Sequence, residues 1–88
     1  MINKDILIIN PMGLHSRPCA VLAKKAKKYD CQIRLSYQDK SADGRSMLGL
    51  MKLGVVNGSM ITLHCEGTQE QEASAALGEF LATLVEAE

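Results

Sequence analysis

The sequence predicts a single α+β domain over residues 1–88, an open-faced sandwich with a four-stranded antiparallel sheet and three helices on one face. A chain of 88 residues is long enough to bury one modest core. Apolar residues recur at every second position in some segments and at helical spacing in others, in the order β-α-β-β-α-β-α. Because each segment is apolar on one side only, these patterns favour an antiparallel sheet that is covered on one face.

The first strand and the first helix are separated by a turn. The strand is expected at residues 4–9, because the turn-forming residues 10–13 follow it. The helix is expected from about residue 16 to residue 29. Ser16 is a suitable N-cap, and Pro18 falls in the first turn, where its missing N–H costs nothing. Apolar side chains then recur at helical spacing, at Cys19, Leu22, Ala23 and Ala26.

Three further strands are predicted. Residues 32–37 and 60–66 alternate with period two, a short return strand is expected at residues 40–43, and residues 57–58 form an Asn-Gly turn before the last strand. The side chains expected to face the core are Ile33, Leu35, Tyr37, Ile61, Leu63 and Cys65.

Two more helices complete the domain. Ser46 is a good N-cap and Gly54 a good C-terminal stop for a brief helix between them. The last helix opens at Thr68, which is expected to form a capping box with Gln71. Its apolar face consists of Ala73, Leu77, Phe80, Leu81 and Leu84, with glutamates on the other face.

The candidate functional residue is His15, which lies where the first loop becomes a helix. A helix N-terminus offers unpaired backbone N–H groups and the positive end of the helix dipole, and Arg17 adds a cation beside it. A nucleophilic imidazole next to an anion site predicts a phosphorylated histidine. The alternative is a loop histidine that only caps or packs.

Two sequence blocks resemble one known family. The block Gly-Leu-His-Ser-Arg-Pro at residues 13–18 is similar to the active-site signature of HPr, the histidine phosphocarrier family of the bacterial phosphotransferase system. Residues 45–54 resemble that family's regulatory serine and short hydrophobic helix, and the likeness extends over essentially the whole chain. The resemblance implies the HPr-like open-faced sandwich.

The resemblance also implies a function. His15 would accept a phosphoryl group on Nδ1 from phosphorylated enzyme I and pass it to IIA domains of sugar permeases. Backbone amides of Ser16 to Pro18 and the Arg17 side chain would contact the phosphate, and an HPr kinase/phosphorylase would modify Ser46, with a transcriptional regulator as a further partner. Because the sequence shows no catalytic base, metal ligand set or glycine-rich nucleotide loop, we expect a stoichiometric carrier without cofactor or metal, and not an enzyme.

Charge is segregated along the chain. Through Lys40, eight cations and three anions give a net charge of +5; from Ser41 onward, two cations and seven anions give −5. The basic part includes the first helix and would attract acidic protein partners. A docking surface is expected at Arg17, Lys24, Lys27, Met47, Leu48 and Met51.

Two alternatives to this function stay open. One is a paralogous carrier in a nitrogen-related or purely regulatory phosphorelay. The other is a small nucleic-acid-binding domain, which the four lysines of the first helix suggest. Overall neutrality and only three aromatic residues argue against nucleic acid.

Composition bears on the thiols and the compartment. Cys19, Cys31 and Cys65 lack CxxC spacing, so neither a disulfide framework nor a zinc site is indicated. Cys19 stands where the family usually has alanine, either as a small core residue or as a thiol made acidic by the helix start and Arg17. No apolar run approaches the roughly 20 residues of a membrane span, and no signal peptide is evident. We therefore expect a cytoplasmic monomer, with His64 solvated on the outer side of its strand.

Overall fold

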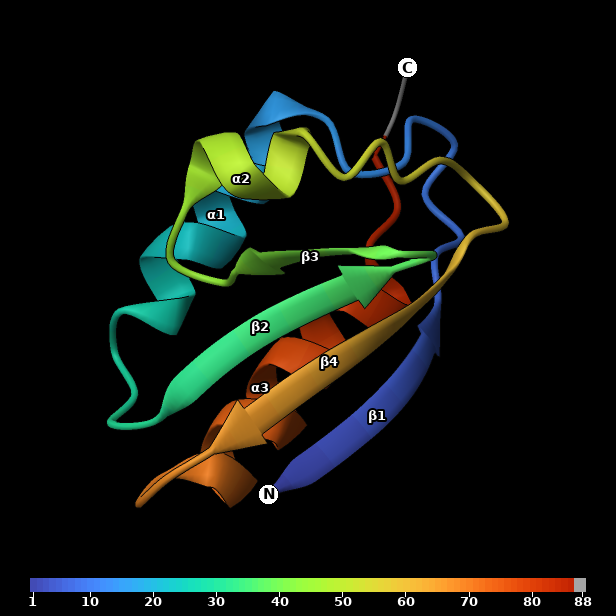
Figure 1. Ribbon diagram of the computed structural model, residues 1–88. Coiled ribbons are helices and arrows are strands. Elements are labelled where there is room, and N and C mark those ends of the chain that lie inside the picture. Colours follow the sequence, from blue (N-terminus) through green and yellow to red (C-terminus); the bar gives the residue numbers. More distant parts are fainter. Residues whose placement is uncertain (87–88) are drawn as a thin grey trace.

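The computed structural model describes residues 1–86 and shows the expected order of elements (Figure 1). All strand pairs are antiparallel, and the strand order in the sheet is β1-β4-β2-β3. The elements are β1 (Ile2–Leu7), α1 (Ser16–Ala26), β2 (Gln32–Tyr37), β3 (Lys40–Asp43), α2 (Met47–Met51), β4 (Met60–Glu66) and α3 (Glu70–Thr83). Helix α3 packs against β1 and β4, whereas α1 and α2 pack against each other and α2 lies beside β3. The predicted fold class is confirmed.

The core lies between the sheet and the helices. Alternate side chains of each strand point into it, which confirms the period-two interpretation, although Tyr37 is only partly buried. The fully buried strand residues include Leu35, Ile61, Leu63 and Cys65, and the helices contribute Cys19, Leu22, Leu50, Leu77 and Leu81. Among the described residues, no helix is both long and apolar enough to cross a membrane.

Strand β1 begins and ends two residues earlier than predicted. Its pairing with β4 runs from Ile2 opposite Cys65 to Leu7 opposite Met60. Ile8 is still buried and its N–H still donates to Ser59, but regular pairing ends where the chain turns toward the first loop. The predicted limits of this strand were therefore wrong, although its place in the order of elements was correct.

The helix caps differ from the predicted ones at two of three N-termini. His15, not Ser16, occupies the N-cap position of α1, and its side chain makes no capping hydrogen bond. At α3 the N-cap is Gln69 and the predicted Thr68–Gln71 box is absent. Instead, the Gln69 side chain accepts from the Asp30 N–H and Glu70 accepts from the Gly67 N–H, so the start of α3 is tied to the loop before β2.

The predicted cap and stop of α2 are correct, whereas the predicted end of α1 is not. Ser46 Oγ accepts a hydrogen bond from the Gly49 N–H at 3.0 Å, as predicted, and Gly54 adopts a positive φ of +70° after α2. Helix α1 ends at Ala26 and not at Tyr29, because the bonds from Lys28 to Lys25 and from Tyr29 to Ala26 are of the tighter three-residue type.

The uncovered face of the sheet carries polar side chains joined across strands. His64 on β4 is half-buried between Asn3 on β1 and Ser36 on β2, with Nδ1 2.6 Å from Asn3 Oδ1 and Nε2 2.9 Å from Ser36 Oγ. The expectation of a simply solvated His64 is therefore wrong. Both of its ring nitrogens are engaged, because its neighbours on the outer face of both adjacent strands are polar.

Candidate functional site

The loop that carries His15 is held by contacts with Val55, in the segment after α2. Gly13 has φ +64°, and a Cβ there would lie 2.3 Å from the Val55 carbonyl oxygen. The next residue, Leu14, is buried and donates its N–H to that same carbonyl at 3.0 Å. Only glycine allows this close approach. The packing of Gly13 and Leu14 against Val55 holds the loop in place, with His15 at the start of α1.

The N-terminus of α1 leaves backbone donors beside His15. The first hydrogen bond of the helix runs from the Cys19 N–H to the His15 carbonyl at 3.2 Å. The N–H groups of Ser16 and Arg17 therefore precede the helical hydrogen-bond ladder, and Pro18 has none to satisfy. The Arg17 side chain is 79% exposed, so its guanidinium can reach an anion bound at this end.

A glutamate from the end of the chain contacts the imidazole. Glu86 Oε1 lies 2.7 Å from His15 Nε2, and Glu86 Oε2 lies 3.9 Å from Arg17 Nη1. The buried Asn10 side chain holds Glu86 in place: Nδ2 donates to Oε1 at 3.0 Å, and Oδ1 accepts from the Glu86 N–H at 2.8 Å. Sequence reasoning missed both residues, since Asn10 was interpreted only as a turn former and Glu86 lies 71 positions from His15.

The Glu86 carboxyl is ionised in this setting. Burial opposes its ionisation, but the hydrogen bonds from His15 and Asn10 and the charges of His15 and Arg17 outweigh that effect. The pKa of Glu86 therefore lies below its ordinary value. As a carboxylate, Glu86 can only accept hydrogen bonds.

Cys19 is a core residue. It is fully buried below the loop, and its Sγ donates to the Leu14 carbonyl oxygen at 3.4 Å. Burial raises the pKa of Cys19 to about 11, so the hypothesis of an acidic, redox-sensitive thiol is wrong. Desolvation here outweighs the helix start and Arg17.

This burial predicts the order of thiol alkylation. With its pKa raised from 9.0 to about 11, the thiolate fraction of Cys19 at neutral pH falls by about 100-fold. The same holds for the buried Cys65, whereas Cys31 is partly exposed. Iodoacetamide labelling followed by mass spectrometry at pH 8 should modify Cys31 first and the other two only slowly. All three should react in urea; fast labelling of native Cys19 would contradict its packing.

The expected docking residues are all exposed. Arg17, Lys24 and Lys27 belong to α1 and its C-cap, and Met47, Leu48 and Met51 belong to α2. Leu48 is 63% exposed, whereas Leu50 on the same short helix is fully buried. Because α1 and α2 pack together, these basic and apolar side chains belong to two adjoining helices, and exposed apolar groups of this kind are found at protein interaction sites.

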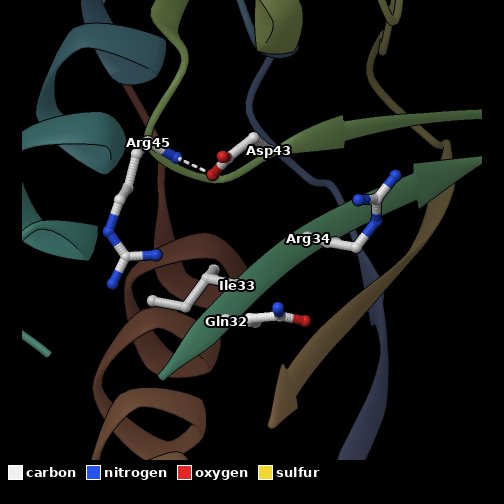
Figure 2. A pocket seen from close by; sticks show the side chains of 5 residues that line it. All are labelled: Gln32, Ile33, Arg34, Asp43 and Arg45. Atoms are coloured by element: carbon white, nitrogen blue, oxygen red, sulfur yellow. Dashed lines mark hydrogen bonds between the residues drawn. The ribbon is translucent and has the colours of Figure 1, made fainter. Parts of the chain in front are cut away.

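A small hollow of about 150 Å³ lies elsewhere, lined by Gln32, Ile33, Arg34, Asp43 and Arg45 (Figure 2). Figure 2 shows the guanidinium groups of Arg34 and Arg45 pointing away from each other. Arg45 donates to the carbonyls of Tyr29 and Cys31, and Arg34 donates to Ser41. The hollow therefore does not gather its cations toward one ligand.

Known proteins are similar to this chain in both sequence and fold. The family profile described as "PTS HPr component phosphorylation site" matches residues 2–83. Phosphocarrier protein HPr of Buchnera aphidicola subsp. Baizongia pistaciae (strain Bp) is 43% identical over 84 residues, which cover 96% of this chain and 99% of that protein. The crystal structure of HPr-C-His from Thermoanaerobacter tengcongensis has a TM-score of 0.87 at 37% identity and covers 92% of this chain and 91% of its own. An HPr dimer from the same organism has a TM-score of 0.71 at 38% identity, with coverages of 91% and 92%.

An open-faced sandwich with a histidine at the first helix start, together with these matches, defines a phosphocarrier of the phosphotransferase system. The chain belongs to the HPr family. The resemblance drawn from residues 13–18 and 45–54 is thereby confirmed.

Proposed function

We propose that the chain accepts a phosphoryl group on Nδ1 of His15 from phosphorylated enzyme I and passes it to IIA domains of sugar permeases. The observation that carries this proposal is the state of the imidazole. Its Nε2 is engaged by Glu86 at 2.7 Å, so among the contacts of residues 1–86 Nδ1 is the ring nitrogen left for chemistry beside the start of α1. Family membership supports the phosphocarrier role.

Transfer on this site needs positioning and charge stabilisation. The Nδ1 lone pair forms the N–P bond while the bond from phosphorus to the donor breaks. The electron pair of the broken bond stays with the donor. The N–H groups of Ser16 and Arg17, the helix dipole and the exposed Arg17 guanidinium would stabilise the phosphoryl oxygens. The phosphoramidate stays reactive, so the next partner can accept the group by the reverse sequence of bond changes.

Phosphorylation of the whole chain tests this function. Incubation with enzyme I, Mg²⁺ and phosphoenolpyruvate should add one phosphate by intact mass, and the phosphate should be lost in acid, as expected for a phosphohistidine. It should then move to an added IIA domain. No added phosphate with an enzyme I that is competent on another HPr would contradict the proposal, and phosphorylation only by a nitrogen-branch enzyme I would assign the chain to that relay.

Ser46 is proposed as a regulatory phosphorylation site. It caps α2 directly before the exposed Met47 and Leu48. A phosphate there adds about −1.5 to −2 charges, which a helix start tolerates. The added charge would repel acidic partners and hydrate the apolar docking residues.

Ser46→Asp is expected to slow phosphorylation by enzyme I by about tenfold, equivalent to about 1.4 kcal/mol. Aspartate is also a good N-cap, so the fold should be preserved. Ser46→Asn is the matched control, because it keeps a capping side chain without charge. Initial rates over a range of HPr concentrations should show a raised KM for the Asp variant only. Equal rates for both variants would contradict the docking argument.

We also propose that the chain acts as a monomer. Strand β1 is an edge of the sheet, and its centre carries the exposed Lys4 and Asp5, which discourage pairing with another sheet edge. The similar protein from T. tengcongensis is described as a dimer, so light scattering at several concentrations is the appropriate test. A stable dimer mass would contradict the proposal.

A further inference from the structure

The contact between His15 and Glu86 is part of a built arrangement. Asn10 is fully buried and uses its amide three times: it donates to the Gly13 carbonyl at 2.8 Å, donates to Glu86 Oε1 at 3.0 Å and accepts from the Glu86 N–H. The loop before His15 and the segment after α3 are thus joined by one side chain. Glu86 itself has a side chain only 15% exposed.

We propose that Glu86, held by Asn10, is a positioning residue that fixes the orientation and tautomer of the His15 ring. A carboxylate oxygen 2.7 Å from Nε2 requires the proton to be on Nε2, because the carboxylate has none to give. Nδ1 then carries the lone pair and faces the incoming phosphorus. This inference rests on the proposed function and names a residue beyond the His15–Arg17 motif.

Glu86 also suits the charge that develops during transfer. When Nδ1 forms the N–P bond, the Nε2 proton stays on the ring, and the ring becomes cationic. A carboxylate in contact with Nε2–H stabilises that charge without touching the phosphoryl group, as the buried aspartate does in serine protease triads. Arg17, whose nearest Glu86 oxygen is 3.9 Å away, can leave it for the phosphate at little cost.

Two substitutions separate the orientation of the His15 ring from the stabilisation of its developing positive charge. Glu86→Gln keeps a carbonyl oxygen that can accept from both Nε2–H and Asn10 but removes the charge. Glu86→Leu removes the acceptor as well. Because Glu86 is largely shielded from solvent, both variants should leave the KM for enzyme I unchanged.

The test combines ¹⁵N NMR of the ring nitrogens with phosphorylation rates. The wild-type protein should show the Nε2–H tautomer of His15, with His64 signals assigned through a His15→Ala sample. Glu86→Leu should show mixed or exchanging tautomers and a kcat lower by about tenfold. Glu86→Gln should keep the tautomer and lose less activity. Thermal unfolding of both variants checks that the fold persists.

Unchanged tautomer populations in Glu86→Leu would overturn the proposal, and so would a changed tautomer with a wild-type kcat. Failure of the proposed function is distinguishable, because the wild-type protein would then accept no phosphate at all. The NMR comparison would still decide whether Glu86 orients the ring.

Discussion

His15→Ala is expected to abolish acid-labile phosphorylation by enzyme I, whereas His64→Ala should be phosphorylated at nearly the wild-type rate. These are the two histidines of the chain, and their surroundings differ in the respect that matters. Both ring nitrogens of His64 are held by Asn3 and Ser36 on the sheet face. Within the part of the chain that the structure describes, His15 is engaged at Nε2 only.

The measurement is intact mass after incubation with enzyme I and phosphoenolpyruvate, followed by mild acid treatment. Loss of the single acceptor should reduce the signal to background, a larger effect than removal of Arg17 or Glu86 could give, since those residues only assist. His64→Ala also controls for loss of any imidazole from the surface. A phosphate retained by His15→Ala would move the acceptor elsewhere and refute the site.

Much of the fold could be predicted because local patterns and tertiary burial agree. The alternation around Ile33 and Leu63 places these side chains in the core, and both strands have the predicted limits. The error in the limits of β1 did not change the order of the elements. The α2 cap was also predictable, since Ser46 satisfies a backbone donor three residues away and needs no distant partner.

The errors occur where a distant segment competes with the local rule. Gln69 bonds with Asp30 across 39 positions, and this contact takes the place of the capping box expected at Thr68. At α1, the tight packing of Gly13 and Leu14 on Val55 sets where the helix begins, so His15 takes the cap position although Ser16 is the better capping residue. Tertiary contacts thus outweighed propensity at both places.

The site could be predicted only in part, because one of its residues comes from a distant part of the chain. His15 and Arg17 belong to one short motif at one helix start, so the sequence places them together. Glu86 joins them only because α3 returns the chain to the first loop, where the buried Asn10 can bind its backbone and side chain. Nothing in the sequence near Glu86 distinguishes it from the other glutamates of the C-terminal part.

Gly13→Ala is expected to lower the free energy of unfolding strongly and to weaken phosphorylation of His15. A left-handed alanine costs about 1–2 kcal/mol. At Gly13 the new methyl group would also lie 2.3 Å from the Val55 carbonyl oxygen and 2.7 Å from the Val56 Cα. These are backbone atoms that cannot rotate away, so relief requires movement of the chain, which typically costs about 1–3 kcal/mol more.

Gly54→Ala is the matched control, because Gly54 has nearly the same φ, +70°, and no atom of the described residues lies within 4 Å of the added methyl group. Both variants gain the same chain stiffness in the unfolded state, so that effect cancels in the comparison. Urea unfolding should place Gly13→Ala well below Gly54→Ala, and the difference measures the clash alone. Since the displaced loop carries His15 away from its 2.7 Å contact with Glu86, phosphorylation should fall further in Gly13→Ala than in Gly54→Ala at temperatures where both are folded. Equal stabilities would mean that the loop can shift without cost and that the position of His15 does not depend on the contact between Gly13 and Val55.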